Sequence, residues 1–132
     1  MFPKKDGVKE IIEPSHKGTQ NVLSAIEKAG TLKRVVHTSS VAAVQRYDRT
    51  SSYVFTERDE ATWSTVENGD FYGVAKLGAE HMVRDHCKGK AYDCAIINPG
   101  LVIGPSLCKA HTKASAVFVR QMLFGNKVSW VY

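Results

Sequence analysis

Apolar residues recur at helical spacing in three parts of the chain. This spacing predicts helices over residues 14–29, 70–88 and 113–124. Pro14 lies near the start of the first helix, where a proline is well tolerated, and a glycine follows the end of each: Gly30, Gly89 and Gly125. Residues 40–68 are mostly polar and are predicted to be irregular.

Two short runs rich in β-branched and apolar residues predict strands over residues 33–39 and 92–98, each buried on both faces. A strand, a long connection with a helix, and a second strand make up the unit from which parallel sheets are built. Because such sheets typically hold about five or six strands, two strands are too few. The sequence therefore predicts an α/β protein of which this chain is an internal part, with open sheet edges that favour self-association.

The composition argues against several classes of protein. Eighteen Lys and Arg against thirteen Asp and Glu give a net charge of +5, but the basic residues after Asp93 form no dense run and no aromatic residues interleave with them. We therefore expect no nucleic acid partner. No apolar run or leader indicates a membrane, so a cytoplasmic location is expected. The three cysteines form no C-x-x-C pair, which predicts reduced thiols and no metal.

The candidate chemistry is a tyrosine and a lysine four residues apart, Tyr72 and Lys76. Chance alone gives about 0.45 such matches in a chain with five Tyr and twelve Lys, so the motif matters only by its position. Tyr72 and Lys76 share one face at the start of a predicted helix, while Ser40 and Pro99 lie beyond the carboxyl ends of the two predicted strands. Ligands of open α/β sheets bind along that edge.

These residue types suit proton transfer that accompanies hydride transfer. A tyrosine gives up its proton only near pH ~10 in water, whereas an ammonium group one helical turn away favours the phenolate. The same lysine can donate hydrogen bonds to a cofactor ribose, and a nearby serine hydroxyl can donate to a substrate oxygen that gains negative charge.

The sequence gives weaker support to the other candidate functional residues. His81 and His86 are five apart and do not share a helix face as a metal pair would, and Cys94 is a strand residue expected to be packed. Trp63 lies in the long polar segment, where it serves either as an anchor of the loop or as a wall of a substrate pocket.

Four blocks in order resemble the extended short-chain dehydrogenase/reductases. Within that family they are most similar to the branch of dihydroflavonol reductases and cinnamoyl-CoA reductases. The blocks cover residues 33–40 (KRVVHTSS), 59–63 (DEATW), 71–80 (FYGVAKLGAE) and 97–105 (INPGLVIGP). The resemblance implies a Rossmann-like, doubly wound parallel sheet, with residues 1–132 forming the central and C-terminal part of a nucleotide-binding domain truncated at both ends.

The resemblance also implies roles for individual residues. Ser40, with Ser39 as its competitor, corresponds to the active-site serine, Tyr72 to the catalytic tyrosine and Lys76 to the catalytic lysine. The residues implied to contact the cofactor are Thr38, Tyr72, Lys76, Pro99, Leu101 and Val102. The implied activity is that of an NADP-dependent oxidoreductase, with NAD as the alternative cofactor and a small carbonyl or alcohol as substrate.

The chain departs from this family in one respect. None of its ten glycines forms the G-x-G-x-x-G or G-x-x-G-x-x-G turn that receives the pyrophosphate of the cofactor, so that N-terminal half is expected to be missing. Alternatives within the superfamily are a nucleotide-sugar epimerase or dehydratase and a hydroxysteroid dehydrogenase/isomerase. From another class, the chain is read as a non-catalytic remnant that binds a partner through its sheet edges.

Overall fold

The computed structural model describes residues 6–105 and 115–125, which fall into two compact units, Met1–Pro99 and Gly100–Tyr132. The described part of the second unit contains α3 (Ser115–Leu123). The helix predicted over residues 113–124 is therefore confirmed from Ser115 onward. Residues 113 and 114, and also Cys108, lie outside the described residues. The first unit consists, in chain order, of η1 (Val8–Ile12), α1 (Glu13–Ala29), β1 (Arg34–Thr38), η2 (Val41–Ala43), α2 (Phe71–Cys87) and β2 (Asp93–Ile97).

The two strands pair in parallel and in register, from Arg34 opposite Asp93 to Thr38 opposite Ile97. Both predicted strands are confirmed, each one residue shorter at either end. The pairing continues beyond the strands, because Ser39 N donates to Ile97 O at 2.8 Å and Val41 N donates to Pro99 O at 3.0 Å. The segments that follow the strands are therefore held side by side.

The predicted first helix is confirmed as α1. It ends at Gly30, whose φ of 66° is a conformation that glycine adopts without strain, and whose N–H donates to Ile26 O. The structure adds η1, a π-helical turn directly before α1. This turn buries Ile11 and Ile12, which form the core cluster together with Ala75 of α2.

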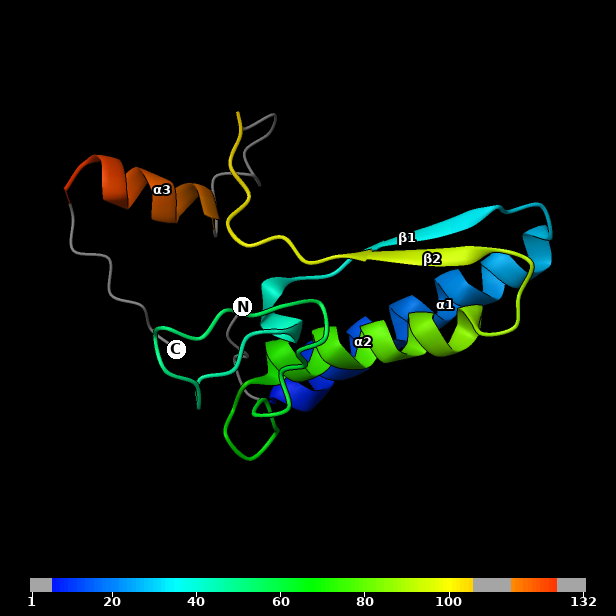
Figure 1. Ribbon diagram of the computed structural model, residues 1–132, viewed down its shortest axis with the longest axis horizontal. Coiled ribbons are helices and arrows are strands. Elements are labelled where there is room, and N and C mark those ends of the chain that lie inside the picture. The colour runs from blue at the N-terminus through cyan, green and yellow to red at the C-terminus, as the bar shows by residue number, and fades with distance from the viewer. Residues whose placement is uncertain (1–5, 106–114, 126–132) are drawn as a thin grey trace. The chain divides into compact units, whose positions relative to one another are not determined.

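The second predicted helix is confirmed as α2, and local side chains define its start. The carboxylate of Asp70 accepts from Gly73 N at 3.0 Å and from the Ser64 hydroxyl at 2.5 Å, so the first turn of α2 is capped. α1 packs along α2 (Figure 1). The two helices come close where His16 contacts Gly78, because a Cβ at that position would overlap the imidazole ring.

The prediction that both strands are buried on two faces is wrong. Both helices lie on one side of the strand pair (Figure 1), and the side chains of Val36 and Ile97 are 58% and 52% exposed. In the described part of the first unit, no element covers the face that bears Val36. A run of β-branched residues indicates that a strand is apolar. It does not indicate whether another element covers each face of that strand.

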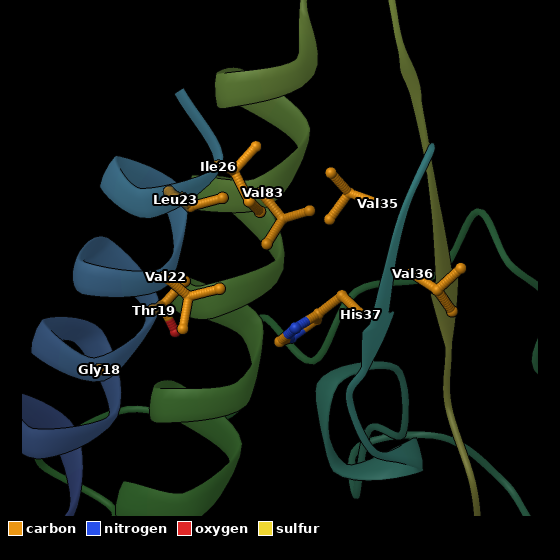
Figure 2. Close-up of a pocket in the computed structure, with 9 residues that line it drawn as sticks. All are labelled: Gly18, Thr19, Val22, Leu23, Ile26, Val35, Val36, His37 and Val83. Carbon is orange, nitrogen blue, oxygen red and sulfur yellow. The ribbon is translucent and has the colours of Figure 1, made fainter. Parts of the chain in front are cut away.

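A cavity of about 210 Å³ lies between β1 and the helices α1 and α2. Figure 2 shows Val35 and His37 pointing from β1 toward Leu23 and Val83, while Val36 points the other way. The Nε2 atom of His37 is buried there without a hydrogen-bond partner. The cavity contains none of the predicted catalytic residues and is a packing gap beneath the strands. No helix among the described residues has the length and apolar character needed to cross a bilayer.

Candidate active site

The segment after β1 places two serines in different environments. Ser39 is only 6% exposed, and its buried Oγ has no hydrogen-bond partner. Ser40 is half-buried with an extended backbone, and its Oγ accepts from Ala42 N at 3.2 Å, which caps η2. An Oγ that accepts this bond keeps its hydroxyl hydrogen for another acceptor. Of the two, Ser40 is therefore the better placed to donate to a ligand.

Tyr72 and Lys76 occupy the first two turns of α2. Lys76 Nζ lies 5.7 Å from the centroid of the Tyr72 ring, so the ammonium group and the aromatic ring interact directly. The tyrosine is 38% exposed. Within the described residues neither the Tyr72 hydroxyl nor Lys76 Nζ has a hydrogen-bond partner. Both groups are therefore available to a ligand.

The helix with this pair packs against the segment with Ser40. η2, which begins directly after Ser40, contacts α2, and Ala61 N donates to Ala43 O at 2.9 Å, which ties the long loop to η2. Pro99 is half-buried beside the same segment, where its carbonyl accepts from Val41 N. Ser40 thus directly precedes an element that packs against the helix carrying Tyr72 and Lys76.

The predicted cofactor contacts divide between the two units. Thr38 is the last residue of β1 and is exposed, at the carboxyl end of the strand pair. Leu101 and Val102 belong to the second unit and are themselves exposed, 43% and 65%. Their contact with a cofactor remains a prediction.

The structure adds Asn98 and Glu80, to which the sequence reasoning assigned no role. Asn98 follows β2 directly, and its side-chain amide donates to Glu80 Oε1 at 2.6 Å and to Ser40 O at 2.9 Å. Glu80 is 2% exposed on α2. A signal for Glu80 was present in the sequence, because it continues the four-residue spacing of Tyr72 and Lys76 on a helix face that also carries Ala79 and Val83.

The weaker candidates each have a partner of their own. His81 Nε2 lies 2.9 Å from Glu60 Oε1, and His86 Nε2 lies 3.0 Å from the Tyr92 hydroxyl. Trp63 packs edge-on against Tyr47 with ring centroids 5.1 Å apart, as an anchor of the loop does. Cys94 is half-buried, as a packed strand residue, and neighbours Cys87. Burial raises the pKa of the Cys87 thiol and Cys94 raises it further, which makes Cys87 a poor nucleophile.

A parallel strand pair with helices on one side and polar groups beyond its carboxyl ends corresponds to one part of a Rossmann-type sheet, which carries helices on both faces. The comparisons with known proteins make this specific. Residues 6–130 match the model of the NAD dependent epimerase/dehydratase family, and the chain belongs to that family. The family resemblance carried by the four sequence blocks is confirmed.

Relatives and solved structures agree with this assignment. The chain is 40% identical to the cinnamoyl-CoA reductase CAD2 of Medicago truncatula over 121 residues, which is 86% of this chain and 36% of the relative. It is 29% identical to a dihydroflavonol 4-reductase of Hordeum vulgare, covering 98% of this chain and 37% of that protein. The structure of Gre2 from Candida albicans in complex with NADPH matches with a TM-score of 0.77 and 28% identity, over 93% of this chain and 40% of that one.

The chain thus spans little more than a third of the length of the curated relatives it matches. Its residues fit one half of a nicotinamide dinucleotide. The ammonium of Lys76 suits the hydroxyl groups of a ribose, and it lies over the ring of Tyr72, at the edge where ligands of such sheets bind. No glycine-rich turn in the sequence suits the pyrophosphate, so these residues account only for the ribose and nicotinamide side.

Proposed function

We propose that the natural protein containing these residues is an NADPH-dependent reductase of a small carbonyl compound, of the dihydroflavonol reductase and cinnamoyl-CoA reductase type. The observation that carries the proposal is the pairing of Lys76 Nζ with the Tyr72 ring at the start of α2, where α2 packs against the segment after Ser40. The names of the relatives and the NADPH bound to the similar Candida albicans structure support the reaction and the cofactor. NAD is the alternative cofactor.

In this proposal NADPH, when bound, supplies the hydride. The Tyr72 hydroxyl donates a proton to the substrate oxygen, and the ammonium of Lys76 favours the phenolate that remains. The Ser40 hydroxyl donates a hydrogen bond to the same oxygen as negative charge develops on it. Ser40 has this role in preference to Ser39, because the Ser39 hydroxyl is buried.

The remaining proposed contacts follow the family resemblance. Lys76 donates to the ribose, Pro99 contacts the nicotinamide ring, and Thr38 borders the site. Leu101 and Val102 are the further cofactor contacts that the resemblance implies. Residues 1–132 are then the central and C-terminal part of one nucleotide-binding domain. The share of each relative that the chain covers supports this organisation.

Replacing Tyr72 by phenylalanine tests the proposal, because the ring remains while the proton donor is lost. We expect turnover by the natural protein to fall on the order of 10²-fold or more, with the Kd for NADPH nearly unchanged. Turnover is followed by NADPH absorbance and binding by NADPH fluorescence. Tyr53→Phe is the matched control, since the Tyr53 hydroxyl is exposed and donates to Asp59 in the loop. Lys76→Ala should impair both turnover and binding.

The outcomes separate the alternative readings. A product at the same oxidation state as the substrate, with no net consumption of NADPH, would favour an epimerase or a dehydratase. Failure of the natural protein to bind NADPH or NADH would favour a non-catalytic interaction module. Full turnover by the Tyr72→Phe variant would require another proton donor.

A further inference from the structure

Glu80 is a buried carboxylate on α2, and the other buried residues of that helix are small or apolar. It is 2% exposed, between Ala79 and Val83 in the buried set of α2. A buried charge is costly unless hydrogen bonds satisfy it. Each carboxylate oxygen has a donor: Asn98 Nδ2 reaches Oε1 at 2.6 Å, and Arg84 Nη2 reaches Oε2 at 3.1 Å.

The two donors differ in what they connect. Arg84 lies one turn further along α2, and its side chain is 47% exposed, so this pair is local to the helix surface. Asn98 lies at the end of β2, 18 residues away in sequence, and the same amide nitrogen also donates to Ser40 O at 2.9 Å. Asn98 therefore bridges α2 to the segment that follows β1.

This bridge acts on Ser40 at a point where the backbone is already constrained. Backbone hydrogen bonds hold the residues on either side of it, from Ser39 N to Ile97 O and from Val41 N to Pro99 O. The bond from Asn98 holds the carbonyl of Ser40 between them. With both neighbours and the carbonyl held, the backbone sets the position of the Ser40 Cβ, and the bond from Ala42 N orients its Oγ.

The other end of the bridge lies on the helix that carries the tyrosine and the lysine. Glu80 is one turn beyond Lys76 and two turns beyond Tyr72, so the three residues share a face of one rigid helix. A short hydrogen bond from an amide to a carboxylate is stronger than one between neutral groups. The path from Glu80 through Asn98 to the Ser40 carbonyl therefore fixes the helix face relative to the serine.

We propose that Glu80 is a positioning residue: by holding Asn98 it sets the location of the Ser40 hydroxyl relative to Tyr72 and Lys76. The inference rests on the proposed function, because that function requires one substrate oxygen to meet both the serine and the tyrosine. Glu80 itself contacts neither substrate nor cofactor. Its effect on turnover is transmitted by Asn98.

The test compares two changes at Glu80 in the natural protein. Glu80→Met removes the acceptor and retains much of the volume, and we expect kcat to fall about 10-fold to 100-fold, since small misplacement of reacting groups has effects of that size. The KM for the substrate and the Kd for NADPH should change less than about 3-fold, because no group that binds them is lost. Glu80→Gln keeps an acceptor oxygen for Asn98 and should recover most of kcat.

Arg84→Met is the matched control. It removes the other donor to Glu80 but leaves the contact with Asn98, so we expect kcat within about 2-fold of the unchanged protein. The side-chain amide signals of Asn98 in a ¹⁵N–¹H spectrum give a readout that is independent of turnover. They should shift strongly in Glu80→Met and remain near their original positions in Glu80→Gln and Arg84→Met.

A second background distinguishes positioning from a general loss of structure. If Glu80 acts through Ser40, Glu80→Met should lower kcat much less in a Ser40→Ala protein than in the unchanged one. An equal fold-loss in both backgrounds would overturn the inference while the proposed function stands. Should Glu80→Met fail to fold, Asn98→Ala takes its place in the same comparison.

The failure of the proposed function has a different signature. Full kcat in the Ser40→Ala protein would remove the role of the serine, and the inference would fall with it. A large loss in Ser40→Ala together with full kcat in Glu80→Met would overturn the inference alone.

Discussion

At the amino end of the strand pair, Arg34 and Asp93 form a two-pronged ion pair at 2.6 and 2.7 Å, with side chains 63% and 59% exposed. At the carboxyl end, the amide of Asn98 joins Ser40 and Glu80, and Glu80 is buried. The ion pair connects the two strands to each other, whereas Asn98 connects the segments that follow the strands to each other and to α2. The two sets of interactions differ in their access to water.

Access to water determines how much the interactions at each end contribute to stability. When two exposed charged groups pair, each gives up contacts with water for a contact with its partner, and salt screens their attraction. The loss of such a pair therefore changes the free energy of unfolding little. A buried carboxylate that loses its donor has no water to replace it. Ser40 lies at the end where these hydrogen bonds are partly shielded from water and reach the buried Glu80, which favours a fixed geometry.

The largest effect is expected from Asn98→Ala, which removes both hydrogen bonds of the carboxyl end. We expect the free energy of unfolding of the natural protein to fall by about 1–3 kcal/mol, because Glu80 Oε1 and the Ser40 carbonyl lose their donor. Urea unfolding followed by circular dichroism measures this change. Asn21→Ala, on the exposed face of α1, is the control and should stay within about 0.5 kcal/mol. Equal losses in the two variants would contradict the difference between the ends.

A smaller effect is expected from His37, which lies in β1 between the two ends. Burial lowers the pKa of His37, the positive charge of Lys76 lowers it further, and the carboxylate of Glu80 opposes the shift. The unfolded chain therefore binds a proton more readily than the folded one. The stability that the neutral ring contributes is present above pH ~6.5 and is lost as the pH falls through the lowered value.

His37→Gln removes this titration. We expect the free energy of unfolding to decrease less between pH 7.5 and pH 5 in His37→Gln than in the unchanged protein, as measured by urea unfolding across that range. A decrease of the same size in both proteins would show that His37 does not titrate differently on folding.

The smallest effect is expected at the amino end. The hydrogen bonds from Arg34 lower the pKa of the Asp93 carboxyl, yet both side chains are largely exposed to solvent. Arg34→Ala should therefore shift the urea midpoint less than Asn98→Ala does, and 0.5 M salt should reduce the shift further. The exchanged pair Arg34→Asp with Asp93→Arg is the control and should restore the midpoint. A loss as large as that of Asn98→Ala would mean that both ends matter equally.

Much of this fold was predictable because its signals are local. The helices follow from apolar spacing and from end signals such as Gly30, and the strands follow from β-branched runs. The start of α2 likewise depends on a nearby side chain, because the Asp70 carboxylate accepts a hydrogen bond from the backbone N–H of Gly73, three residues further along. The family followed from four short blocks, each of which can be recognised without knowing its surroundings.

Other features were not predictable from local pattern. The expectation that both faces of the strands are buried failed at Val36 and Ile97, since the cover of a strand comes from residues distant in sequence. The roles assigned to Ser40, Tyr72 and Lys76 remain predictions. The contact between Lys76 and Tyr72 and the packing of η2 against α2 support them, and the substitutions described above test them.

The sequence by itself determined the two strands and the helices α1 and α2, their order, the family and the four-residue spacing that puts Tyr72 and Lys76 on one helix face. Only the tertiary structure decided that Ser39 is buried while Ser40 is accessible, and that Glu80 meets Asn98. Asn98 lies 18 positions from Glu80 and 58 positions from Ser40, its other partner. These contacts depend on the register of two parallel strands and on the rotation of α2 against them. Neither quantity is encoded in any single segment, because both result from how the segments pack against one another.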